Sequence, residues 1–463
     1  MKYENLKLGE KAKEAFMKGK GVDYIKKNCP VYLNTKPVIY GLNVTDLIIS
    51  AELAGIPTLL VGDTGCGKSQ LAQDIYNYHF NGNQGEKGHG TKIRGRPELD
   101  IYDEIYTRLN LEKKIREPTE NVHSLIHFLD EMNRTHPVTQ NQFFGLGDGF
   151  LEYRGSKLSL GKNGYFWTIA TANLGNGEFQ GTFNTDKSLY NRFGVAIDFD
   201  YEMFQPTDED RILIKQLRAA DPKIKEAPLN DLSEEIMNAS EEISRLSVNP
   251  GLEATAVANY LEFGLENCEE GRTSITSGSK QSKKGKTWPH VCQECHKNRD
   301  SKYICSLIKQ PQPRTLQSTI RYASALDFLI RLKDNSKKIN ATDLMFKSFE
   351  LTAAYQQILN PNVLRSEYYE QNPYFISDIV VKLKNDFKKN EDMILTTLEN
   401  SLKGEKTMDY FMHNKKTHLG YNNLTDEGKS KVKWVDPFTN NKPIGMDWVN
   451  QYVDLNIKLH KKK

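Results

Sequence analysis

Cysteine and long apolar runs are scarce in this chain. It holds six cysteines in 463 residues, too few for the disulfide framework of a small secreted domain, so we expect a reducing, cytoplasmic setting. No apolar run reaches the roughly 20 residues of a membrane-spanning helix. The first residues, MKYENLKLGEKAKEAF, are polar and lack the apolar centre of a signal peptide.

An excess of charge of one sign is also missing. The 63 Lys and Arg residues nearly balance the 60 Asp and Glu residues, and the formal net charge is +3. This balance gives no argument of its own for nucleic-acid binding. We find no internal repeat. The length of the chain predicts two or three domains with a sizeable core.

A phosphate-binding pattern lies in TLLVGDTGCGKSQLAQDIY, residues 58–76, which predicts an apolar strand, a glycine-rich turn and an amphipathic helix. Backbone N–H groups of such a turn surround phosphate oxygens, and the start of the helix adds its positive end. Lys68 would reach the β- and γ-phosphates, and Ser69 would bind Mg²⁺. The alternative is a turn that binds nothing, with Cys66 as a small filler. The predicted nucleotide-binding residues are Gly62, Asp63, Thr64, Gly65, Cys66, Gly67, Lys68, Ser69 and Gln70.

Two adjacent carboxylates follow an apolar run in LIHFLDEMNRTHP, residues 125–137. In phosphate-loop enzymes the acid at the end of a second strand holds Mg²⁺, and a following Glu polarises the attacking water. Asp130 would therefore join Ser69 in binding Mg²⁺, and Glu131 would act as the base. The alternative is a pair of residues that cap the next helix.

A third strand is predicted in YFWTIATANLGNGEFQGTFNTDKSLYNRFGVAIDF, residues 165–199. It ends at Asn173, whose polar side chain is suited to orient water beside Glu131. Arg192 follows a short predicted helix, and a guanidinium there could stabilise the charge of a transferring phosphate. Taken alone, Arg192 is better explained as an ordinary surface arginine.

Four motifs in order, GDTGCGKS, DEMNRTHP, ATANLGNGEFQGT and YNRF, resemble the AAA+ ATPases of the MoxR-like group. That group includes the ATPases that activate Rubisco and nitric oxide reductase. The resemblance covers roughly residues 38–200. It implies that Asn173 is the sensor 1 residue and Arg192 an arginine finger supplied in trans. The chain departs from the pattern where Ala172 and Leu174 flank that asparagine and where Asn191 replaces an aspartate.

The expected fold is α/β, with an AAA+ parallel sheet covered by helices on both faces, a helical lid with a polar Cys-rich insert, and a mainly helical C-terminal tail. The expected divisions are 1–36, 37–204, 205–350 with the insert at 268–305, and 351–463. Helices are predicted over 207–220, 232–246, 251–267 and 315–332. The resemblance makes Arg314, in QPQPRTLQ, the sensor 2 residue; the alternative is a surface arginine.

Two further segments, 97–118 and 150–166, occupy positions where the family has inserts that face a ring pore or a partner. Tyr102, Tyr106 and Tyr153 could grip a substrate chain there. Aromatic packing within a hairpin explains the same residues equally well.

The polar segment 268–305 carries a Cys-x-x-Cys pair and two further cysteines. Cys292, Cys295, Cys305 and Cys268 could hold a structural Zn²⁺, with His290 or His296 as the alternative fourth ligand. The competing interpretation is a disordered loop with incidental cysteines. Its lysines could touch nucleic acid, although such loops are usually only solvated.

These observations predict an ATP- and Mg²⁺-dependent ring-forming ATPase, with six subunits in the ring. It would remodel a client protein or help to insert a metal or cofactor, together with a von Willebrand A-type adaptor. The alternatives are a DNA-translocating, helicase-like motor and the GTPase motor of a restriction system.

Overall fold

The computed structural model describes residues 35–82, 88–153, 155–173, 183, 187–219, 229–248, 250–265, 304–389, 391–392 and 394–395. The chain divides into two compact units. The first contains the described residues before 250 together with Arg321–Ile339, and the second contains Pro250–Ile320 and the described residues from Asn340 onward.

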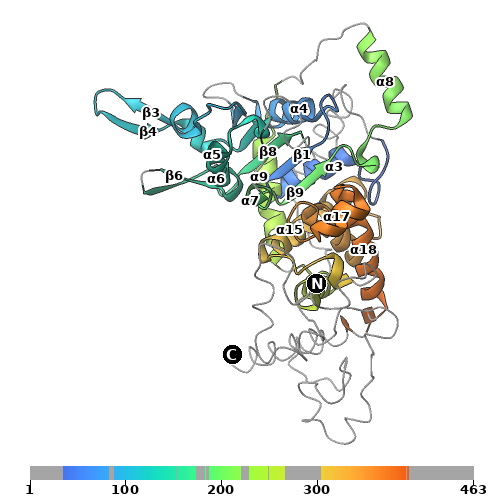
Figure 1. Ribbon diagram of the computed structural model, residues 1–463. Helices are drawn as coiled ribbons and strands as arrows, with labels where there is room; N and C mark the ends of the chain where they lie inside the picture. The colour runs from blue at the N-terminus through green and yellow to red at the C-terminus, as the bar shows by residue number, and fades with distance from the viewer. Residues whose placement is uncertain are drawn as a thin grey trace, which may run out of the picture. The chain divides into compact units, whose positions relative to one another are not determined.

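A five-stranded sheet forms the centre of the first unit (Figure 1). The strand order is β2-β5-β8-β1-β9, and all neighbouring strands are parallel. The strands are β2 (Gly90–Arg94), β5 (Ile126–Asp130), β8 (Trp167–Ala172), β1 (Thr58–Val61) and β9 (Val195–Asp198).

Three of the five strands are buried on both faces. Every residue of β1, β8 and β9 is buried, and neighbouring side chains of a strand point to opposite faces. Helix α3 (Val44–Leu53) packs against β1 and β9, and helix α4 (Lys68–Phe80) packs against β5 and β8. The predicted α/β fold with a parallel sheet covered by helices on both faces is confirmed.

The strand order places β8 between β5 and β1. Val61 at the end of β1 pairs with Ala172 of β8, and Leu129 near the end of β5 pairs with Ala170. The residues that follow these three strands therefore lie side by side at the carboxyl edge of the sheet, where open α/β sheets carry their sites.

Two antiparallel hairpins extend from the first unit on one side (Figure 1). They are β3 (Thr107–Asn110) with β4 (Ile115–Pro118), and β6 (Phe150–Tyr153) with β7 (Ser156–Ser159). The rings of Tyr102 and Tyr153 stack with their centroids 6.1 Å apart, so the base of the first hairpin contacts the second.

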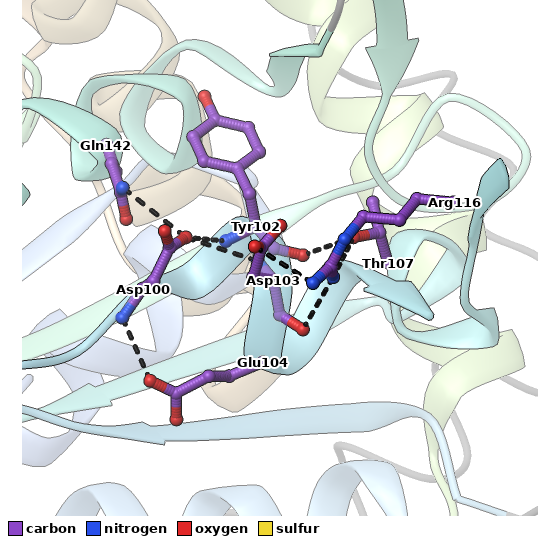
Figure 2. Close-up of polar contacts among 7 residues, drawn as sticks. All are labelled: Asp100, Tyr102, Asp103, Glu104, Thr107, Arg116 and Gln142. Atoms are coloured by element: carbon purple, nitrogen blue, oxygen red, sulfur yellow. Dashed lines mark hydrogen bonds and ion pairs between the residues drawn. The ribbon is translucent and has the colours of Figure 1, made fainter. Parts of the chain in front are cut away.

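A polar network fixes the base of the β3–β4 hairpin (Figure 2). Asp100 accepts hydrogen bonds from the backbone N–H groups of Tyr102 and Asp103 at 3.0 and 3.2 Å, which caps the π-helix η3 (Tyr102–Tyr106). Arg116 of β4 pairs with the Asp103 carboxylate at 3.0 Å. The hairpin is therefore tied at its base to η3.

Tyr106 packs inside the protein. Its side chain is fully buried, and its hydroxyl lies 2.6 Å from Nδ1 of His127. The His127 Nε2–H donates to the Ser124 carbonyl at 3.1 Å, so Nδ1 is the acceptor for Tyr106. Burial lowers the pKa of His127 to about 3, which keeps the ring neutral. Tyr106 is therefore a packing residue, and its buried side chain is not available to grip a substrate chain.

The second unit is helical. It contains α10 (Leu252–Asn259), η8 (Tyr260–Gly264), α14 (Ile304–Leu307), the start of α15 (Pro313–Lys333), α16 (Ala341–Ala353), α17 (Pro361–Tyr368) and α18 (Asn372–Lys388). Tyr260, Phe346 and Phe387 form an edge-to-face aromatic cluster with centroids 5.3–6.4 Å apart. The buried Tyr260 hydroxyl donates to Asp386 at 2.8 Å, so its polar end is satisfied.

The remaining elements belong to the first unit. They are η4 (Glu120–His123), η5 (Met132–Arg134), α5 (Pro137–Gln140), η6 (Asn141–Phe143), α6 (Phe144–Asp148), α7 (Lys187–Tyr190), η7 (Glu202–Phe204), α8 (Asp208–Ala219) and α9 (Ser233–Val248). Helices α8, α9, α10 and α15 occur where helices were predicted. In the part of the chain that the structure describes, no helix is both long and apolar enough to cross a membrane.

Candidate functional site

The glycine-rich turn joins β1 to α4 as a tight loop. Gly62, Gly65 and Gly67 have φ angles of 141°, 86° and 95°, which side chains strongly disfavour. A Cβ on Gly62 would also lie 3.2 Å from Phe199 and 3.3 Å from Asp200. The glycines of the pattern are therefore required by the backbone path, and α4 begins immediately after the loop, at Lys68.

Lys68 points back into this loop. Its ammonium donates to the carbonyl oxygens of Gly62 and Asp63, both at 2.7 Å, and lies 3.3 Å from the Cys66 sulfur. The side chain of Lys68 is only 6% exposed, so a full positive charge is held at the centre of the loop by neutral acceptors. A phosphate oxygen would be a stronger partner for this ammonium than either carbonyl.

The two residues predicted to bind Mg²⁺ are in direct contact. The Ser69 hydroxyl donates to Asp130 Oδ1 at 2.7 Å, although the residues are 61 positions apart. A hydroxyl and one carboxylate fit Mg²⁺, which prefers oxygen ligands and completes its shell with waters and phosphates. Among the described residues no group of three or more His, Cys, Asp or Glu side chains could hold a metal.

Thr171 fixes both acids and was not singled out from the sequence. Its hydroxyl donates to Asp130 Oδ1 at 2.9 Å and accepts the backbone N–H of Glu131 at 2.8 Å. Thr171 is 1% exposed. A hydroxyl near the end of a mostly apolar strand, beside a strand whose end carries two adjacent acids, is the sequence signal that could have identified it.

Glu131 has a constrained backbone and two cationic neighbours. Its φ and ψ angles of 53° and 48° lie in the left-handed region, which is uncommon for a residue with a side chain. The carboxylate pairs with Arg134 at 3.1 Å and with Arg94, at the end of β2, at 3.7 Å. A Cβ on Gly95 would lie 2.1 Å from the Glu131 carbonyl oxygen, so the end of β2 approaches this turn as closely as a glycine allows.

Asn173 follows β8 and is held by its backbone. The Asn133 side chain donates to the Asn173 carbonyl at 2.8 Å and accepts its N–H at 3.4 Å. Asn133 is 3% exposed and its carbonyl accepts the Phe183 N–H at 2.7 Å. Asn173 therefore lies beside the turn that carries Glu131, with its backbone groups occupied by Asn133.

Asp200 is another residue that was not singled out from the sequence. It follows β9, and its carboxylate accepts the backbone N–H of Asp63 at 3.1 Å across 137 positions of the chain. This bond ties the start of the glycine-rich loop to the strand beside β1. Gln70, predicted to bind nucleotide, instead directs its side-chain amide to Asp74 at 2.8 Å within α4.

The other residues predicted to be functional are Arg192, Arg314 and the four cysteines of the polar segment 268–305. Arg192 follows α7 in the first unit and pairs with Asp148 at 3.5 Å. Arg314 is an exposed residue in the first turn of α15 and belongs to the second unit, so its contact with nucleotide stays a prediction. Cys268, Cys292 and Cys295 lie outside the described residues, as does the side chain of Cys305, and the zinc prediction is untested.

The arrangement at the carboxyl edge of the sheet defines the class of fold. A glycine-rich loop follows β1, two acids follow β5, and a polar residue follows the strand between them. This is an α/β fold of the kind found in P-loop AAA+ proteins, followed by a helical region.

Comparisons with known proteins agree with this fold. The chain is similar to the crystal structure of a "putative ATPase" from Cytophaga hutchinsonii, with a TM-score of 0.52 and 15% sequence identity. The similarity covers 81% of this chain and 97% of that one. No known protein-family profile matches the chain, and no curated protein sequence matches it.

Proposed function

We propose that this protein is a Mg²⁺-dependent ATPase. The observation that carries the proposal is the direct 2.7 Å contact between Ser69 of the glycine-rich loop and Asp130 of the acid pair. Two segments far apart in the chain meet at one point with the oxygen ligands that Mg²⁺ requires. The name of the structurally similar protein from Cytophaga hutchinsonii is consistent with this proposal.

The proposed chemistry follows from the positions of the side chains. Backbone N–H groups of the loop and the Lys68 ammonium would bind the phosphates, because both are donors grouped at the start of α4. Ser69 and Asp130 would hold Mg²⁺, which neutralises phosphate charge when bound. Glu131 would accept the proton of the attacking water, and the Asn173 side chain would orient that water.

A matched pair of variants at Ser69 tests the proposal. Ser69→Ala removes the hydroxyl, whereas Ser69→Thr keeps it, as the motif allows either residue. We expect Mg²⁺-dependent ATP hydrolysis by the native protein and by Ser69→Thr, and loss of most of it in Ser69→Ala. Absence of ATP hydrolysis by the native protein, or equal rates in both variants, would contradict the proposal. A parallel assay with GTP identifies the preferred nucleotide.

We further propose that the ATPase works as a ring, with six subunits, on a client protein. The β3–β4 hairpin supports a partner contact because three large apolar side chains at its end are exposed: Leu109 at 53%, Leu111 at 78% and Ile115 at 46%. Apolar groups grouped at the end of a hairpin are unfavourable in water and are typical of contact surfaces.

The client proposal is tested with a double variant, Leu109→Ser/Leu111→Ser. We expect it to keep basal hydrolysis and to lose a protein that co-purifies with the native chain. Lys113→Ser/Lys114→Ser, on the same loop, is the matched control. If DNA stimulates hydrolysis by the native protein and by the leucine variant but not by the lysine variant, the result would favour the alternative function of a DNA-translocating motor.

A further inference from the structure

Arg192 is held from three sides in the first unit. Its guanidinium carbon lies 4.3 Å from the centre of the Phe144 ring, a cation–π distance. Its Nε lies 3.5 Å from Asp148 Oδ2, and its Nη1 donates to the Ser188 carbonyl at 3.0 Å. Phe144 and Asp148 are the two ends of α6, so one short helix supplies both the aromatic face and the carboxylate.

The close approach of α6 to Arg192 depends on a glycine. A Cβ on Gly147 would lie 2.4 Å from the Arg192 Cβ and 2.9 Å from its Cγ. Real Cβ atoms do not approach other atoms this closely. The stem of Arg192 therefore lies directly on the backbone of α6, one residue before Asp148, and the guanidinium reaches the carboxylate without spanning a gap.

These contacts occupy the inner part of the guanidinium. Asp148 faces Nε, the nitrogen nearest the backbone, in an ion pair that is not a hydrogen bond, and Nη1 donates to the Ser188 carbonyl. Within the described residues, Nη2 donates no hydrogen bond. A carboxylate that sequesters an arginine pairs with two of its nitrogens in a fork, whereas an ion pair at a single nitrogen, Nε, can orient the side chain without such a fork.

We propose that Asp148 is a positioning residue that orients Arg192 for contact with a phosphate bound by a neighbouring copy of this chain. This inference rests on the proposed ATPase function and on the trans role of Arg192. The physical reason is pre-organisation. A long arginine side chain loses rotamer freedom, and therefore entropy, when it binds a phosphate. Because α6 already fixes the Arg192 side chain in the folded protein, less entropy remains to be lost on binding.

The test compares substitutions at Asp148 in the full chain. Asp148→Asn keeps the shape and removes the charge, Asp148→Glu keeps the charge, and Glu152→Gln is a matched control at the exposed position of β6. We expect turnover to fall about tenfold in Asp148→Asn with KM for ATP unchanged, because an arginine finger contributes 10³–10⁵-fold and part of that depends on orientation. Asp148→Glu should recover part of the turnover, and Glu152→Gln should match the native protein.

A mixing experiment separates a trans effect from a general structural defect. Asp148→Asn subunits keep Glu131, and Glu131→Gln subunits keep an oriented Arg192. A mixture should therefore hydrolyse ATP faster than the mean of the two variants assayed alone. A defect confined to the Asp148→Asn subunit's own site would give only that mean and would overturn the inference.

The remaining outcomes are distinct. Native turnover in Arg192→Ala would contradict the trans role that the family resemblance implies for Arg192, on which this inference depends. Loss of turnover in Arg192→Ala with native turnover in Asp148→Asn would overturn only the inference about Asp148. Turnover above the native value in Asp148→Asn would also overturn it, because Asp148 would then restrain Arg192. If Asp148→Asn fails to fold, Phe144→Leu, which removes only the aromatic face, should show the same fall in turnover at constant KM.

Discussion

Thr171→Val removes one hydroxyl from the buried end of β8 while it keeps the shape of the side chain. In the native protein this hydroxyl donates to Asp130 at 2.9 Å and accepts the Glu131 N–H at 2.8 Å. The variant therefore releases the proposed metal ligand and the proposed base together, without touching either side chain. Thr171→Ser is the matched control, because it keeps the hydroxyl and loses only a methyl group.

The expected cost follows from the two bonds. A hydrogen bond to a charged group contributes about 1.5–3 kcal/mol, and a buried N–H without an acceptor costs about 1–3 kcal/mol. Asp130 keeps its bond from Ser69, so we expect the lower part of the combined range, about 2.5–4 kcal/mol in the free energy of unfolding. If ~1.4 kcal/mol of this is lost in the transition state for hydrolysis, turnover falls about tenfold.

Urea denaturation measures the free energy of unfolding, and steady-state ATP hydrolysis measures the turnover. Thr171→Ser should lie within about 1 kcal/mol of the native free energy of unfolding, because one buried methyl group contributes ~0.8 kcal/mol. Both native stability and native turnover in Thr171→Val would refute the view that this hydroxyl organises the acid pair.

Three further predictions concern other parts of the first unit. Arg94→Ala should raise turnover by up to about fivefold, because an exposed ion pair of up to ~1 kcal/mol then no longer restrains Glu131; a lower rate would argue against restraint. Between pH 7.5 and 5 the native protein should lose about 2 kcal/mol more stability than His127→Gln in urea titrations, because the unfolded chain gains a proton near pH 6.5 that the folded ring, with a pKa of about 3, does not; equal losses would contradict this. Arg116→Ala should speed proteolysis of the β3–β4 hairpin by breaking its pair with Asp103, with ATP binding unchanged; unchanged proteolysis would show that this pair does not fix the hairpin.

The sequence alone predicted those parts of the fold and site whose physical requirements are set by residues close together in the chain. The glycine-rich loop could be predicted because an apolar run, glycines at fixed spacing and an amphipathic pattern specify a strand, a turn and a helix. Asp130 could be placed for the same reason, since it ends an apolar run. The proximity of Ser69 to Asp130 was implied once both strands were assigned to one parallel sheet.

The supporting residues could not be predicted because their contacts depend on which strands are neighbours. Thr171 contacts the acids only because β8 lies between β5 and β1. Asp200 reaches Asp63 across 137 residues of chain, and neither residue has a distinctive local pattern. Tyr106 was ambiguous because an aromatic residue near a hairpin suits either solvent or the core. Its contact with His127 of β5 decides between them.

ATP hydrolysis by Glu131→Gln, measured alongside ATP binding on the same preparation, tests the central claim most directly. Glutamine keeps the size of the side chain and leaves Ser69, Asp130 and Lys68 in place, but it cannot accept a proton. We predict ATP binding within about threefold of native affinity and turnover lowered about 10²–10⁴-fold, which is the contribution of a general base. Turnover within twofold of the native protein would contradict the assignment of this site as the catalytic centre of an ATPase.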